Sequence, residues 1–78
     1  MKRKPVLIDA KKFGARLREA RIKSGKKQLE VAKSVGLAPN SISYHEQGHS
    51  IPSLDLAVQL SCCLNVSLEY LVGLKNEP

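Results

Sequence analysis

Long apolar runs are missing from this sequence of 78 residues. No stretch approaches the roughly 18 apolar residues that cross a membrane. The basic amino-terminal start is followed only by Val6, Leu7 and Ile8, whereas a signal peptide needs an apolar core of about 7–15 residues. We therefore expect a cytoplasmic protein of a single domain, without a membrane partner.

Cysteine is scarce as well, and the two cysteines, Cys62 and Cys63, are neighbours. Adjacent cysteines rarely form a disulfide, because the bridge fixes the separations of their Cα and Cβ atoms. No histidine pair stands nearby to complete a zinc site. We expect two free thiols in a reducing compartment, and neither a metal nor a cofactor.

The signals of β-strands and of catalysis are also absent. The sequence has no sustained alternation of apolar and polar residues and no hairpin dipeptide. It has no nucleophile–base pair, phosphate-binding loop or cluster of metal ligands. We expect an all-α fold, and we do not expect an enzyme.

Positive charge is concentrated in one half of the chain. Residues 1–33 hold twelve Lys and Arg against three acids, a net charge of +9, while residues 34–78 hold one lysine against four acids, a net charge of −3. Such asymmetry indicates a polyanionic partner, with nucleic acid as the first candidate; the alternative is a solvated helix that happens to be basic. Residues 36–48, GLAPNSISYHEQG, contain no lysine or arginine and one acid.

Apolar periodicity and capping residues predict five short helices. They run from a cap at Asp9 to about Lys23, from Gln28 to Val35, from Pro39 to about Gln47, from a cap at Ser53 to Leu64, and from a cap at Ser67 to Val72. On the fourth helix we expect an inward face of Leu54, Ala57, Leu60, Ser61 and Leu64. Residues 1–8 form a basic arm, residues 9–74 the domain, and residues 75–78 a frayed tail.

Residues 28–47 have the pattern of a helix, a tight turn at Gly36 and a second helix, which is typical of a helix-turn-helix. Eleven positions then match one family in order and spacing: Arg21, Gly25, Gln28, Ala32, Gly36, Ile42, Glu46, Gly48, Pro52, Leu64 and Leu71. The sequence resembles the Cro/phage-repressor type (lambda-repressor-like, XRE-type) of helix-turn-helix domain over roughly residues 10–73. The resemblance implies a compact five-helix domain that binds double-stranded DNA through its second and third helices.

The resemblance also implies roles for individual residues. The candidates for contact with bases are Pro39, Asn40, Ser41, Ser43 and Tyr44. Those for contact with phosphates are Gln28, His49 and Ser50, together with Lys26 and Lys27, at which the sequence departs from the family pattern. Asn40 can pair with both N6 and N7 of adenine, and the third helix has no lysine or arginine to pair with guanine, so this helix is expected to favour A·T pairs. Arg21 and Glu46 match an internal ion pair. Alternatively, Asn40 and the serines only solvate a helix start, and Tyr44 covers the edge of the core.

Three features depart from the pattern or extend it. Lys26 stands where an apolar residue is usual. Lys27 and Ala38 occupy the cap positions of the second and third helices, where serine or threonine is common. Because alanine is a poor cap, the third helix is expected to begin loosely and to tighten on DNA. Residues 2–4, Lys-Arg-Lys, either follow the DNA or form a solubilising tail.

The most direct function is a sequence-specific transcriptional regulator, a repressor that acts as a homodimer on an inverted-repeat operator. Apolar candidates for the dimer contact are Val58, Cys62, Val72 and Leu74. The alternative is an antitoxin or another protein-binding module that uses the same domain to hold a protein partner such as a toxin or an antirepressor.

Overall fold

The computed structural model describes residues 8–78, so the basic sequence at residues 2–4 lies outside the described residues. Five helices follow one another along the chain: α1 (Ala10–Lys23), α2 (Gln28–Val35), α3 (Pro39–Glu46), α4 (Leu54–Leu64) and α5 (Leu68–Val72). No strand occurs within residues 8–78. The predicted all-α fold is confirmed. The end of α3 differs from the prediction by one residue, because Gln47 caps this helix instead of continuing it.

Side-chain caps begin three of the helices, as the sequence predicts. Asp9 Oδ1 accepts the N–H of Lys11 at 2.9 Å, Ser53 Oγ accepts the N–H of Leu56 at 3.2 Å, and Ser67 Oγ accepts the N–H of Tyr70 at 3.1 Å. Each bond satisfies a backbone donor that has no partner inside its helix. These caps place the helix starts at the expected residues.

The starts of α2 and α3 have no such cap. An ammonium group cannot accept a hydrogen bond, so the Lys27 side chain does not cap α2; instead the Glu30 carboxylate accepts the Lys27 backbone N–H at 3.0 Å. Ala38 offers no side-chain acceptor to α3, which begins with Pro39 in its first turn. Proline suits this position because its missing N–H would have had no partner.

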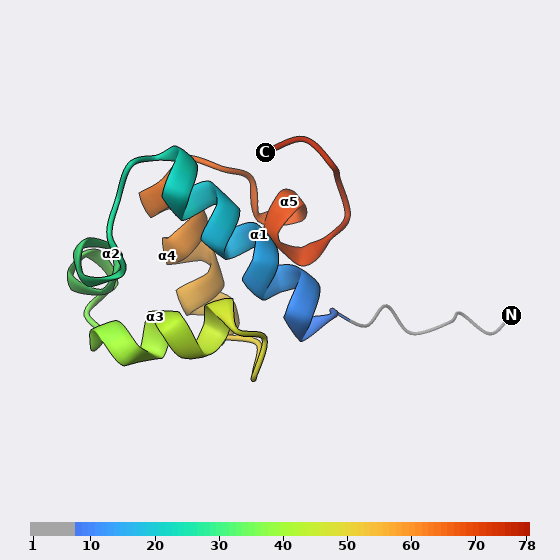
Figure 1. Ribbon diagram of the computed structural model, residues 1–78. Helices are drawn as coiled ribbons and strands as arrows, with labels where there is room; N and C mark the ends of the chain where they lie inside the picture. The colour runs from blue at the N-terminus through green and yellow to red at the C-terminus, as the bar shows by residue number, and fades with distance from the viewer. Residues whose placement is uncertain (1–7) are drawn as a thin grey trace, which may run out of the picture.

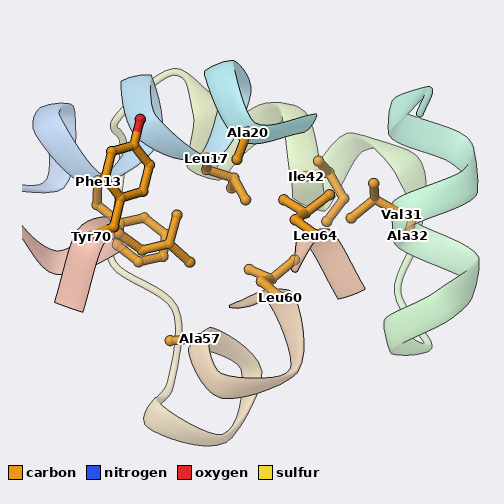
Figure 2. Close-up of a cluster of buried hydrophobic side chains, with 11 residues drawn as sticks. Phe13, Leu17, Ala20, Val31, Ala32, Ile42, Ala57, Leu60, Leu64 and Tyr70 are labelled. Atoms are coloured by element: carbon orange, nitrogen blue, oxygen red, sulfur yellow. The ribbon is translucent and has the colours of Figure 1, made fainter. Parts of the chain in front are cut away.

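The core lies where all five helices meet, as Figure 2 shows. Its largest fully buried side chains are Phe13, Leu17, Val31, Ile42, Leu60 and Leu71. Figure 1 shows α2 and α3 together at one end of the molecule and α5 at the other, with α1 running between them. Side chains of α1 therefore join the two ends of the domain into one core.

Leu54 does not face inward, and this part of the sequence prediction is wrong. Its exposed fraction is 72%, whereas Ala57 and Leu60 on the same helix are buried. Leu54 is the first residue of α4, and in this turn Leu56 packs against the core instead. Periodicity identifies an apolar stripe, but the neighbouring helices decide how far along the helix the stripe is covered.

α1 crosses α3 with almost no space between their backbones. A Cβ on Gly14 would lie 2.6 Å from the carbonyl oxygen of Glu46, closer than real Cβ contacts allow. Gly48 has a φ of +80°, and a Cβ there would lie 2.8 Å from the Cα of Lys11. Glycine at both positions lets α1 fix where α3 lies, because no side chain separates the two chain segments.

The carboxyl-terminal residues contact α1 rather than extend away from it. The Arg16 guanidinium donates to the carbonyl oxygens of Tyr70, at 2.6 Å, and of Lys75, and to Oδ1 of Asn76 at 3.0 Å. It also lies 4.6 Å from the centroid of the Tyr70 ring. One arginine thus satisfies two carbonyl groups and an amide oxygen near the end of the chain.

Candidate nucleic-acid interface

α2 and α3 are held at a fixed angle by a glycine turn and by buried side chains. Gly36 has a φ of +73°, in the left-handed region that favours glycine, and the N–H of Leu37 donates to the carbonyl of Ala32 at 2.9 Å. Val31, Ala32 and Ile42 are fully buried between the helices. This arrangement is a helix-turn-helix whose second helix presents one face outward.

The outward face of α3 carries small polar side chains and one aromatic ring. Pro39 and Asn40 are exposed, Ser41 and Ser43 are half-buried, and Tyr44 has an exposed fraction of 49%. Asn40, Ser41 and Tyr44 line one shallow hollow together with His45. All five side chains predicted to contact bases therefore belong to a single accessible helix, while Ile42 anchors it from the opposite side.

The expected ion pair between Arg21 and Glu46 is present and nearly buried. Arg21 Nε donates to Glu46 Oε2 at 2.5 Å, and Arg21 Nη2 donates to Glu46 Oε1 at 3.1 Å. The exposed fractions of the two side chains are 14% and 3%. The hydrogen bonds that Arg21 donates to the Glu46 carboxylate raise the pKa of Arg21 above its usual value, although burial opposes the shift.

Glu46 also holds the first residue of α2. Gln28 Nε2 donates to Glu46 Oε1 at 3.1 Å, and Arg21 Nη1 donates to the carbonyl of Lys26 at 3.1 Å. One carboxylate and one guanidinium thus connect α1, the segment before α2, and α3. Their contacts set the position of the start of α2 relative to the outward face of α3.

The five residues predicted to contact phosphates are not equivalent in the structure. Lys27 is exposed at the start of α2, where unpaired N–H groups favour an anion. The Lys26 ammonium instead donates to the carbonyl of Cys63 at 2.9 Å, and the Gln28 amide nitrogen donates to Glu46. His49 Nε2 lies 3.0 Å from Gln47 Oε1, and the Ser50 carbonyl lies 3.0 Å from His45 Nδ1. Lys27 is exposed and Ser50 is bonded only through its backbone carbonyl, so these two side chains are less engaged by the domain than those of Lys26, Gln28 and His49.

Sequence reasoning did not select Arg18 or Gln47. Both line a hollow between α1, α2 and α3, together with Gln28, Ser43 and Glu46. Gln47 Nε2 donates to Ser43 Oγ at 2.9 Å. The sequence gives no strong signal for either residue, since Arg18 is one of many basic residues and Gln47 stands at the end of a helix.

Much of the basic half of the chain is used inside the domain. The side chains of Arg16, Arg21, Lys23 and Lys26 each have an acidic or carbonyl partner. Among residues 8–78, no ion pair involves Lys11, Lys12, Arg18, Lys27 or Lys33. The charge asymmetry of the sequence thus serves both tertiary contacts and an accessible basic surface.

Within residues 8–78, no group of three or more His, Cys, Asp or Glu side chains lies close enough together to hold a metal ion. In that range there is also no helix with the length and apolar character needed to cross a bilayer.

Comparison with known proteins identifies relatives of this chain in sequence and in structure. The family model for "Helix-turn-helix" matches residues 17–71. The HTH-type transcriptional regulator ImmR of Bacillus subtilis is 40% identical over 61 residues, which cover 78% of this chain and 48% of ImmR. The chain therefore spans about half the length of that relative.

Two solved structures have the same fold and comparable size. The restriction-modification controller protein C.AhdI of Aeromonas hydrophila is 33% identical with a TM-score of 0.75, and the match covers 81% of this chain and 96% of that chain. The P22 c2 repressor, solved in complex with a synthetic operator, is 32% identical with a TM-score of 0.74, and the match covers 77% of this chain and 91% of that chain.

Proposed function

Because the chain belongs to the Cro/phage-repressor type of the helix-turn-helix family, we propose that it is a sequence-specific, double-stranded-DNA-binding transcriptional regulator. It acts in the cytoplasm as a repressor and binds an inverted-repeat operator as a homodimer. One domain of this size contacts few base pairs, so two copies on half-sites about one turn (~34 Å) apart give useful affinity.

The observation that carries this proposal is the outward face of α3. An accessible helix of the right size for a major groove carries Asn40 and Tyr44 outward, while buried Ile42 and Glu46 fix it to the domain. Side chains held in this way meet a duplex without first rearranging the fold. Asn40 is the candidate for adenine, and Tyr44 or Pro39 for a thymine methyl group.

Contacts with phosphates supply affinity that does not depend on sequence. Lys27 and the N-terminus of α2 form the main phosphate contact in this proposal, because Lys27 is exposed there. Gln28 remains a phosphate ligand through its backbone and its second amide hydrogen. Lys26 and His49 contribute only if they exchange their present partners for a phosphate oxygen, whereas Ser50 is engaged only through its backbone carbonyl and can donate its hydroxyl without such an exchange.

The dimer contact is proposed at the carboxyl-terminal end of the domain. Leu74 has an exposed fraction of 66% and follows α5, and the Arg16 contacts with Lys75 and Asn76 hold this segment against α1. Val72 is half-buried beside it, while Val58 and Cys62 are exposed on α4. Leu74→Lys should lower the mass measured by light scattering from dimer to monomer, whereas Ile22→Lys, at an exposed position on α1, should not.

A protein partner is the second candidate, and the exposed apolar side chains of α4 favour it. Leu54 and Val58 lie one turn apart and have exposed fractions of 72% and 42%. A toxin or an antirepressor that binds there would leave α3 accessible. A complex that forms equally well with the Asn40→Ala variant, and that Leu54→Lys disrupts, would support this role.

Selection of bound DNA from a random pool tests the main proposal. We expect enrichment of an inverted repeat whose half-sites are read through A·T pairs at α3, since this helix has no arginine or lysine for guanine. Enrichment of a single site without symmetry would contradict the homodimer. Absence of enrichment at every salt concentration would contradict sequence-specific binding itself.

A further inference from the structure

The Tyr44 ring is supported on one side by a connected set of three side chains. Gln47 Nε2 donates to Ser43 Oγ at 2.9 Å, and Gln47 Oε1 lies 3.0 Å from His49 Nε2. The His49 ring is stacked on the Tyr44 ring, with centroids 4.9 Å apart and an interplanar angle of 26°. We call Ser43, Gln47 and His49 the Tyr44 support.

The hydrogen bonds of the support are mutually consistent. Because the amide nitrogen of Gln47 is turned to Ser43, its oxygen is left as the acceptor for a proton on Nε2 of His49. The imidazole is therefore held at its edge by Gln47 while its face meets Tyr44. Its position depends on α3 through Ser43 and Gln47, although His49 itself lies beyond the helix.

A second histidine, His45, contacts the Tyr44 ring from a different direction. The His45 ring meets the Tyr44 ring edge-on, with centroids 5.9 Å apart and an interplanar angle of 74°. His45 Nδ1 lies 3.0 Å from the carbonyl of Ser50, which fixes this ring as well. Tyr44 nevertheless keeps an exposed fraction of 49%, so the ring is oriented by its neighbours without being covered by them.

We propose that His49 is a positioning residue for Tyr44 and thereby determines the base preference at the base pair that Tyr44 contacts. This inference rests on the proposed DNA-binding function. An isolated tyrosine on a helix surface samples several rotamers, and ordering it on binding costs free energy. Stacking on His49 orders the ring before DNA arrives, so that one ring orientation meets one base edge.

This role differs from the phosphate contact expected for His49. The Nε2 atom is directed at Gln47 and the ring face is directed at Tyr44. Loss of a phosphate ligand weakens binding to all sequences about equally, whereas loss of a positioning residue changes the preference at one base pair. The two roles therefore give different results in a binding-site selection.

The experiment compares DNA selected from a random pool by the wild type and by Tyr44→Ala, His49→Ala and His49→Phe. Tyr44→Ala should lose base preference at one position of each half-site. His49→Ala should reduce the preference at that same position by roughly fivefold or more, the size of a good direct contact. His49→Phe keeps an aromatic face for stacking and should retain most of the preference. Gln59→Ala, at an exposed position on α4, is the control.

The outcomes separate this inference from the proposed function. If the wild type enriches a site and His49→Ala enriches the same site with an unchanged profile, the positioning role is overturned while the DNA-binding function stands. A uniform loss of affinity without a change in profile would assign His49 to phosphate and also overturn it. No enrichment by the wild type overturns both. If His49→Ala does not fold, His49→Leu replaces it, because leucine fills space without an aromatic face.

Discussion

The Arg21 guanidinium and the Glu46 carboxylate are joined by two hydrogen bonds, of 2.5 Å and 3.1 Å, between α1 and α3. Gln28 at the start of α2 bonds to the same carboxylate. The pair therefore connects the three helices whose relative positions define the candidate DNA-binding face. Its geometry is bidentate, the arrangement in which an arginine and a carboxylate bind most strongly.

Removal of Glu46 should destabilise the domain strongly. Glu46→Ala leaves a nearly buried guanidinium without its counter-charge, so the free energy of unfolding should fall by about 3 kcal/mol. Urea denaturation of the wild type and the variant measures this difference. Glu19→Ala breaks the exposed pair with Lys23 and also the bond from Tyr70, and it should cost less. Equal stability of Glu46→Ala and the wild type would contradict a structural role for the pair.

Gly14→Ala should destabilise the protein although alanine favours helices. The helix gains up to about 1 kcal/mol from the exchange, but the new methyl group would lie 2.6 Å from the Glu46 carbonyl oxygen. Overpacking of this kind costs roughly 1–3 kcal/mol and should separate α1 from α3. Thermal unfolding checks the sign, with the exposed position Ala15→Gly as the control for helix propensity alone. A rise in melting temperature for Gly14→Ala would contradict the close crossing.

Tyr70 should make stability depend on pH in alkaline solution. Burial, aided by its hydrogen bond to Glu19, raises the pKa of Tyr70 above its usual value of 10.0. The folded state thus holds the phenolic proton more tightly than the unfolded state, so this contribution is complete below pH 10 and is lost as the pH rises through the raised pKa. Urea denaturation between pH 8 and about 11 should show a steeper loss for the wild type than for Tyr70→Phe. Parallel pH profiles would contradict the shift.

Replacement of Asn40 and of Lys27 by alanine should affect DNA binding in different ways. Asn40→Ala should cost about 1–3 kcal/mol on the selected site and relax the preference for adenine at one position. Lys27→Ala should weaken binding to specific and random DNA alike and reduce the slope of log affinity against log salt by about 1. Fluorescence anisotropy with labelled duplexes at several salt concentrations measures both. If Lys27→Ala changes the base preference, the two assignments must be exchanged.

The fold was predictable because its signals are local. Asp9, Ser53 and Ser67 mark helix starts by the hydrogen bonds that their own side chains accept, and Gly36 marks a turn by its positive φ. Such features depend on residues a few positions apart, so sequence order alone specifies them. The outward residues of α3 followed in the same way, since one buried residue, Ile42, defines the opposite face of a short helix.

Contacts between distant segments were decided only by the tertiary structure. Leu54 belongs to the apolar stripe of α4, yet no neighbouring helix covers it. Lys26 and Lys27 are neighbouring basic residues, but the ammonium of Lys26 donates to the carbonyl of Cys63, 37 residues away, whereas Lys27 stays exposed. The sequence by itself determined five helices, their caps and the helix that faces outward, through local hydrogen bonding and periodicity. The tertiary structure decided which charged side chains stay accessible. It also decided that the His49 ring stacks on the Tyr44 ring, because only the folded chain brings these groups together.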